Sequence, residues 1–304
     1  MTSAYKVAEN IYLIDAQMYS IPNFTSVYLL AEEKMALIES GPLTSAEFIL
    51  DGIHQLGFDP RDIAYIIVTH IHLDHAGGAG ALVKQMPQAK VLVHDRGARH
   101  LVDPSRLVKS VEQAWGEEEM KRQGGILPIE LERVCVLKDG DVIELGHEEK
   151  LTIIHAPGHA KHEICIYESR NRGLFTGDAV GIYFPEKEIL IPTTPPPDFD
   201  LNVAVSTIKR LMELPVEMLL FSHFGVTSKV EETLYLAIRE LKSWGEVVWQ
   251  AREDFEEAVT KLRVQASLEL AAVEGNKSLG EYIINDFVPL CAAGYMNYYQ
   301  KGGK

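Results

Sequence analysis

The sequence predicts an α/β protein in which two β-sheets are layered inside helices, followed by a helical region at the C-terminal end. Three observations lead to this prediction. Short runs of β-branched and aromatic residues alternate with segments of helical periodicity. These runs recur in two similar halves, which favours two sheets covered by helices. Beyond residue 226 only helical patterns remain. We therefore expect a catalytic domain over residues 1–226 and a helical C-terminal region over 227–304.

The expected strands are short apolar or alternating runs bounded by turn residues. Pro22-Asn23 and Gly41-Pro42 are such turns in the first part of the chain. The run at 63–68 is wholly apolar up to Val68, as in a buried strand. Strands are expected at residues 10–14, 25–30, 34–39, 63–68, 90–94, 134–136, 141–145, 150–155, 163–167, 173–176 and 217–222.

Helices are expected where apolar residues recur every three to four positions. In the segment 44–56, Ile49, Ile53 and Leu56 fall on one face, and Gly57 follows as a stop signal. A helix also starts at the Gly77-Gly78 pair, and others are expected at 98–125, 201–214, 230–244 and 246–262.

The segment Ile189–Phe199 (ILIPTTPPPDF) is rich in proline. Proline lacks the amide donor that helices and central strands need, so we expect an irregular surface loop over this whole segment. Such a loop could cover the mouth of a site or serve as a rigid connector.

Composition restricts the class of partner. The 304 residues are 46% hydrophobic, enough for a large core, and carry a net charge of −15 from 44 acidic and 29 basic residues. Such an acidic balance without a basic patch disfavours a nucleic-acid partner. The three cysteines are far apart, and no segment resembles a signal peptide or a membrane span. We therefore expect a cytoplasmic protein that binds neither nucleic acid nor membranes and acts on a small molecule.

One stretch carries the chemistry. Residues 67–78 are IVTHIHLDHAGG, in which His70, His72, Asp74 and His75 follow an apolar run directly. Imidazole and carboxylate are the usual ligands of borderline divalent metals. Side chains two apart point to the same side of an extended segment, so His70 and His72 can converge on one ion. Asp74 and His75 follow where the chain turns into a helix.

The pattern H-x-H-x-D-H followed by A-G-G resembles the metallo-β-lactamase superfamily. The resemblance continues in order along residues 8–226, with His159 in HAPGHAKH, Asp178 in LFTGDAV and His223 in LLFSHFG. Glu39 stands where the family usually has the Asp of Asp-x-Gly, which is a departure from its pattern. The resemblance implies an αββα sandwich of two mixed β-sheets.

The resemblance also implies a dinuclear metal site. Zn²⁺ is favoured by the imidazole-rich set, with Fe or Mn as alternatives. One ion would bind His70, His72 and His159, the second would bind Asp74, His75 and His223, and Asp178 would bridge them.

The implied reaction is hydrolysis of a small ester, thioester or lactone by a metal-bridging hydroxide. Asp74 could orient the nucleophile or carry its proton. Tyr183 could donate a hydrogen bond to an oxyanion, although an aromatic pocket wall formed with Phe184 is the favoured interpretation. Glyoxalase II-like thioesterases and quorum-quenching lactonases are similar members. The alternatives are a dioxygenase of the persulfide type, which uses one iron, and a phosphodiesterase.

Several nearby residues have a supporting role or none. Thr69 and Glu39 are candidate partners of the metal histidines, whereas a plain turn or sheet hydrogen bond is equally compatible with the sequence. His162, three residues after His159, is expected to support the site rather than to bind metal. The C-terminal helices are expected to cap the pocket or to form the contact of a homodimer.

Overall fold

The computed structural model describes residues 3–184, 187–270 and 277–303. Contacts divide the chain into two compact units. The first unit comprises Met1–His155 and Ile164–Phe175, and the second comprises Ala156–Glu163 and Thr176–Lys304. The predicted ligands at 70–75 therefore belong to the first unit, and those at 159, 178 and 223 belong to the second. The boundary at residue 226 stays a prediction.

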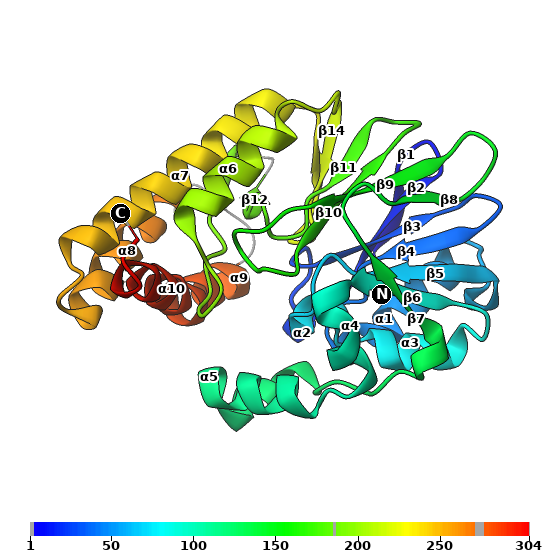
Figure 1. The fold of residues 1–304 in the computed structure, drawn as a ribbon, viewed down its shortest axis with the longest axis horizontal. Coiled ribbons are helices and arrows are strands. Elements are labelled where there is room, and N and C mark those ends of the chain that lie inside the picture. Colours follow the sequence, from blue (N-terminus) through cyan, green and yellow to red (C-terminus); the bar gives the residue numbers. More distant parts are fainter. Residues whose placement is uncertain (1–2, 185–186, 271–276, 304) are drawn as a thin grey trace. The chain divides into compact units, whose positions relative to one another are not determined.

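The first unit is built on a seven-stranded mixed sheet whose strands follow chain order (Figure 1). Neighbours are antiparallel from β1 to β4 and parallel from β4 to β7. The half-buried or exposed β1 is the strand of this sheet that the sequence patterns do not predict. The strands are β1 (Ala4–Ala8), β2 (Ile11–Asp15), β3 (Ser26–Leu30), β4 (Met35–Ile38), β5 (Ile63–Ile67), β6 (Lys90–His94) and β7 (Val134–Leu137).

Helices cover one face of this sheet (Figure 1). Ile49 and Ile53, Leu82, and Leu101 come from three different helices and join the sheet residues in one buried cluster. Each such side chain contributes about 1.5–3 kcal/mol by its burial, which fixes the sheet against the helices. These helices are α1 (Ala46–Gln55), α3 (Ala79–Gln85) and α4 (Asp95–Val102), and the longer, more exposed α5 (Ser105–Gln123) follows α4.

Four further strands of the first unit form antiparallel pairs in the order β8, β9, β10, β11. The rings of Tyr28 on β3 and Phe175 on β11 meet edge to face with centroids 5.2 Å apart, so the two groups of strands are packed against each other. The strands are β8 (Val142–Glu144), β9 (Lys150–His155), β10 (Ile164–Glu168) and β11 (Gly173–Phe175).

The second unit contains two antiparallel strand pairs and the helix α6 (Leu201–Leu211). The pairs are β12 (Ile182–Phe184) with β13 (Ile189–Ile191), and β14 (Met218–Leu220) with β15 (Val226–Thr227). The expectation of an irregular loop over Ile189–Phe199 is thus wrong for its first three residues, because β12 provides them with a pairing partner. The remaining residues of that segment, 192–199, are irregular as predicted.

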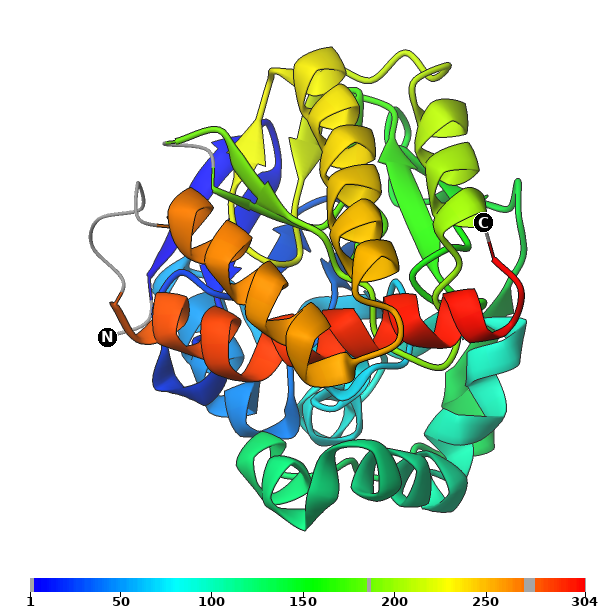
Figure 2. The same ribbon diagram turned by 90° about the vertical axis from the view of Figure 1, so that its left-hand side faces the viewer.

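Among the residues that the structure describes, four α-helices follow in the second unit. The helix α10 crosses the end of α7 and lies beside α8 (Figure 2). The predicted break between residues 244 and 246 is wrong, because α7 continues through Gly245. Trp244 and Val248 keep its buried stripe continuous across that glycine, and Tyr299 Oη donates to the Gly245 carbonyl at 2.7 Å. The break lies at 251–254 instead. The helices are α7 (Val230–Gln250), α8 (Phe255–Leu270), α9 (Lys277–Tyr282) and α10 (Val288–Gln300).

The structure describes all three cysteines as free thiols. Cys165 and Cys291 are buried and Cys135 is half-buried. Within the ranges that the structure describes, none of the helices combines the length and the apolar character needed to cross a bilayer.

Candidate metal site

The first ligand set consists of His70, His72, Asp74 and His75. It follows β5, whose apolar residues carry the chain through the core to the end of the sheet. His72 has extended backbone angles and stands at the N-cap of a short helix, α2 (Leu73–Ala76), which contains the other two ligands. The strand end thus presents two imidazoles, and the helix start presents a carboxylate and a third imidazole.

The side chains of the first ligand set crowd together. His70 Nε2 lies 2.9 Å from His72 Nδ1, and the rings of His70 and His75 have centroids 4.0 Å apart. His75 Nε2 lies 3.6 Å from Asp74 Oδ2. His70 and His75 are almost completely buried. Metal binding needs neutral imidazoles, and nitrogen atoms brought this close together have the arrangement of ligands to a metal.

Glu39 and Thr69 hold the first ligand set from behind. The Glu39 carboxylate accepts from Thr69 Oγ1 at 2.6 Å and from the Thr69 amide at 3.2 Å. It also lies 3.0 Å from His75 Nδ1, and Thr69 Oγ1 lies 3.0 Å from His70 Nδ1. All four residues are buried. Of the two alternatives that the sequence leaves open, Thr69 and Glu39 contact the histidines His70 and His75.

The second ligand set consists of His159, Asp178 and His223, all buried. His159 follows β9, Asp178 follows β11, and His223 follows β14. The two oxygens of Asp178 face different imidazoles: Oδ2 lies 3.4 Å from His159 Nε2, and Oδ1 lies 3.3 Å from His223 Nε2. One carboxylate placed between two imidazoles in this way has the arrangement of a ligand shared by two ions.

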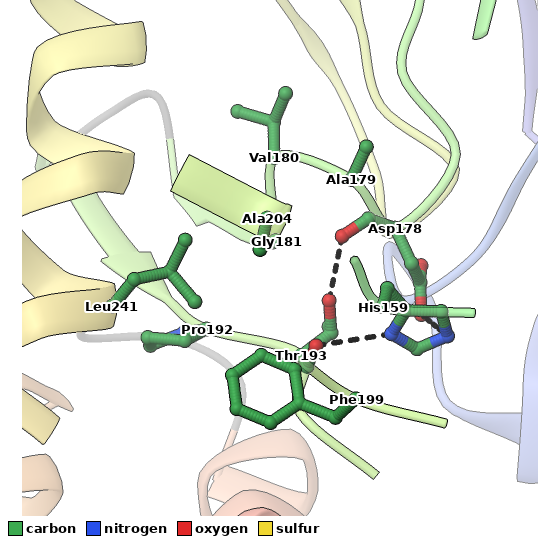
Figure 3. Close-up of a pocket in the computed structure, with 10 residues that line it drawn as sticks. All are labelled: His159, Asp178, Ala179, Val180, Gly181, Pro192, Thr193, Phe199, Ala204 and Leu241. Atoms are coloured by element: carbon green, nitrogen blue, oxygen red, sulfur yellow. Dashed lines mark hydrogen bonds and ion pairs between the residues drawn. The ribbon is translucent and has the colours of Figure 1, made fainter. Parts of the chain in front are cut away.

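Two buried residues that the sequence analysis missed fix the second ligand set. Thr193 Oγ1 donates to the Asp178 carbonyl at 2.7 Å, and the Thr193 carbonyl lies 3.0 Å from His159 Nδ1 (Figure 3). The Glu163 carboxylate accepts from the Asp178 amide at 2.6 Å. The peptide groups on both sides of Asp178 are therefore held. A charged residue directly before a buried strand was the available signal for Glu163; a lone Thr in a loop gives none.

Gly158 allows the His159 turn to approach α6. Its φ is +144°, and a Cβ there would lie 2.4 Å from the Ala204 Cα. No other residue fits that space without moving the helix. The Pro-Gly dipeptide before His159 thus places that imidazole by close backbone packing.

A common orientation supports metal binding by both sets. The Nδ1 atoms of His70, His75 and His159 each face an oxygen of a supporting residue, which is Thr69, Glu39 and Thr193 in that order. The Nε2 atom of each ring faces another member of the same ligand set. Metal-binding histidines are normally oriented in this way. Ligand atoms of His70 and His72, of His70 and His75, and of Asp74 and His75 lie within 4.8 Å of one another. The donors of each set therefore fit a divalent metal.

Three further residues near the ligands in sequence are Tyr183, His155 and His162. Tyr183 on β12 is buried, and its ring stacks on Phe221 with centroids 5.1 Å apart. The ring of His155 stacks on His94 at 4.7 Å. Burial, with His155 as the next cause, lowers the pKa of His94. His162 is half-buried.

A small cavity adjoins the second ligand set (Figure 3). It is lined by His159 and Asp178 on one side and by apolar groups such as Pro192, Phe199 and Leu241 on the other. Its volume of about 10 Å³ holds roughly one water molecule. The cavity brings residues of the irregular segment next to two predicted metal ligands.

Comparison with known proteins gives one family throughout. A sequence profile of the metallo-beta-lactamase superfamily matches residues 21–223. The metallo-beta-lactamase fold-containing protein ST1585 of Sulfurisphaera tokodaii is 30% identical over 219 residues, which are 71% of this chain and 78% of that protein. The crystal structure of ST1585 superposes with a TM-score of 0.63 at 28% identity and covers 77% of this chain and 86% of that one.

Two further relatives have named activities. An acyl-coenzyme A thioesterase, MBLAC2 of Bos taurus, is 30% identical over 52% of this chain and 55% of its own length. An N-acyl homoserine lactonase of a Bacillus species is 29% identical over 60% of this chain and 63% of its own length. The chain therefore spans between half and two thirds of each of these enzymes.

Proposed function

The chain belongs to the metallo-β-lactamase superfamily of hydrolases and has its fold, with mixed sheets flanked by helices and a helical C-terminal region, and on this premise we propose that it hydrolyses a small ester, thioester or lactone at a dinuclear metal site. The first and second ligand sets together supply the seven donors. The observation that carries the proposal is Asp178, whose two oxygens face imidazoles from two different segments.

Each donor has an assigned place in this proposal. When bound, two divalent ions supply a water of lowered pKa and positive charge for a developing oxyanion. Asp178 is the shared ligand. Zn²⁺ is favoured because most donors are imidazoles, with Fe or Mn as alternatives. The first ion is assigned to His70, His72 and His159, and the second to Asp74, His75 and His223.

Two residues are candidates for the chemical step. Asp74 is half-buried at the start of α2, where its carboxylate can orient the attacking water or take its proton. The favoured role of Tyr183 is an aromatic pocket wall, which its stacking on Phe221 supports; a wall residue predicts that Tyr183→Phe leaves turnover unchanged. The alternative role is a hydrogen bond from its phenol to the oxyanion, in which case Tyr183→Phe lowers turnover.

The substrate class rests on the named relatives. One is an acyl-coenzyme A thioesterase and another is an N-acyl homoserine lactonase. Both activities open an acyl bond by attack of water on a carbonyl. We extend that shared step to this chain and leave the acyl and leaving groups open.

The cellular setting belongs to the same proposal. We assign residues 1–226 as the catalytic domain and 227–304 as its helical extension. The acidic balance and the free thiols support a cytoplasmic enzyme of small molecules that binds neither nucleic acid nor membranes. The C-terminal helices are proposed either to cap the pocket or to form the contact of a homodimer.

The test is proton release by purified protein whose metal content has been measured. The panel holds S-acylglutathiones, acyl-coenzyme A, acyl-homoserine lactones, simple lactones and aryl phosphodiesters. Acid production from a thioester or lactone, absent with Asp178→Ala, is the expected result. Turnover of the phosphodiesters alone would show that the substrate is a phosphodiester and not an ester, thioester or lactone. Silence with metal present, together with oxygen uptake on a glutathione persulfide, would overturn hydrolysis in favour of the iron dioxygenase reaction.

A further inference from the structure

The helix α10 contacts the backbone of the irregular segment 192–199 without intervening side chains. Gly294 is the contact point: a Cβ on this residue would lie 1.6 Å from the Thr194 carbonyl oxygen and 2.7 Å from its carbon. Every other amino acid would have to push the helix and the segment apart. Gly294 is buried and has ordinary helical geometry, so its small size rather than its backbone freedom is what the contact requires.

Hydrogen bonds from α10 hold the same segment at several points. Cys291 Sγ donates to the Pro192 carbonyl at 3.3 Å, and Thr194 Oγ1 donates to the Cys291 carbonyl at 3.2 Å. Asn297 Nδ2 and Lys301 Nζ, on α10 and just after it, both donate to the Pro197 carbonyl, at 3.0 and 2.8 Å.

Aromatic packing extends this contact. The ring of Phe199 meets the rings of Tyr295 and Tyr298 on α10, with centroids 4.9 and 6.2 Å apart. The segment 192–199 is therefore held by α10 from its first residue to its last.

The residue between two of these attachment points contacts the second ligand set. Thr193 lies between Pro192 and Thr194 and is buried. Its carbonyl orients His159, and its hydroxyl holds the Asp178 carbonyl. A displacement of the segment by α10 would therefore move an oriented imidazole and a carboxylate together.

We propose that α10, through Gly294 and the segment 192–199, is a positioning element for the second ligand set. Gly294, Cys291 and Thr194 are its positioning residues, and Thr193 connects them to His159 and Asp178. The inference rests on the proposed metal binding. It gives the C-terminal helical region a role in metal binding that is separate from capping a pocket or forming a dimer.

Gly294→Ala tests this inference, with Gly280→Ala as the matched control. Gly280 is also helical, and a Cβ there meets nothing within 4 Å. Divalent metal affinity is measured on the full chain by competition with a chromogenic chelator, and the Co²⁺ absorption spectrum reports ligand geometry. Gly294→Ala is expected to weaken affinity about 10- to 100-fold and to alter the spectrum. Gly280→Ala should match the wild type. Wild-type affinity and spectrum in folded Gly294→Ala would overturn the inference.

If Gly294→Ala does not fold, a milder variant tests the positioning role of α10. Thr194→Val removes the hydroxyl bond to Cys291 at almost constant volume, and we expect a several-fold loss of affinity and a changed Co²⁺ spectrum. Wild-type values for this variant would overturn the inference. A wild-type chain that binds no divalent metal would overturn the proposed function as well, whereas metal binding that is insensitive to these changes overturns the positioning role alone.

Discussion

At the scale of single residues, Asp178 makes the strongest prediction. Its oxygens face His159 and His223, so Asp178→Ala removes the ligand that both proposed ions share. We expect the loss of at least one equivalent of bound metal and about a 100-fold or larger fall in turnover. Elemental analysis of the purified variant measures the first effect. His162→Ala, three residues from His159, is the control and should keep its metal. If His162→Ala lost metal and Asp178→Ala kept it, the assignment of the metal ligands would be wrong.

Glu39 makes a second residue-scale prediction. It accepts two hydrogen bonds from Thr69 and contacts His75 Nδ1 in a buried setting. Glu39→Gln keeps the shape but removes the charge, so the orientation of His75 is weakened. We expect metal affinity to fall about 10- to 100-fold, as measured by chelator competition. Glu47→Gln, an exposed position on α1 in the same unit, should leave affinity unchanged. Equal affinities in the two variants would show that Glu39 serves the fold alone.

At the scale of elements, Arg133 closes the end of α3. Its Nη1 donates to the Val83 carbonyl at 2.8 Å, its Nε and Nη2 donate to Ala89 at 3.0 and 2.6 Å, and Nη2 also donates to Met86. These carbonyls lie at and just after the end of the helix, where intrahelical donors run out. The Val83 and Met86 carbonyls each accept one backbone amide as well, at 3.3 and 3.0 Å, so the Arg133 side chain adds charged donors to three acceptors.

Replacing Arg133 should therefore lower the stability of the first unit. We expect Arg133→Met to reduce the free energy of unfolding by about 2–4 kcal/mol, because buried acceptors lose charged donors. Urea denaturation measures this loss. Arg61→Met is the control: its ion pair with Asp59 is largely exposed, so a change within about 0.5 kcal/mol is expected. If Arg133→Met also changed the free energy of unfolding by only about 0.5 kcal/mol, water would be replacing the hydrogen bonds of the Arg133 side chain.

Elements are predictable where local pattern and tertiary context agree. The apolar run before His70 identifies β5, and the first ligand set stands out because its spacing is a local property. The second ligand set was predicted only through the resemblance of its motifs to the family. The sequence predicts a helix break at Gly245 and an irregular loop at Ile189–Ile191, because a glycine and nearby prolines are local signals for such structure. Packing by Tyr299 and pairing with β12 override them. Thr193 escaped prediction for the same reason: its role depends on residues distant in sequence.

At the scale of the whole molecule, charge sets the response to pH. The chain carries 44 acidic and 29 basic residues, so repulsion between carboxylates grows as they ionise. The buried Glu149 adds a response of its own. Glu149 is fully buried, with Arg170 Nε 3.4 Å from its Oε2. Burial above all, and then the nearby Glu168, raises the pKa of Glu149 to about 8 although Arg170 opposes the shift.

The sign of the resulting pH dependence is opposite to that of a salt-bridged acid. The ordinary pKa of Glu149 is 4.5. Between that value and about 8 the folded protein keeps a proton that the unfolded chain releases. The contribution of Glu149 to the free energy of unfolding therefore falls as pH rises through this window and levels off above it.

Glu149→Gln removes the titrating group and keeps its size. The variant should gain about 3 kcal/mol of stability relative to the wild type as pH rises from 5.5 to 8.5. Urea denaturation at both pH values measures the difference. Glu148→Gln is an exposed neighbour with the same loss of charge and should show no such trend. A constant difference between Glu149→Gln and wild type at the two pH values would mean that Arg170 keeps the buried carboxylate ionised throughout.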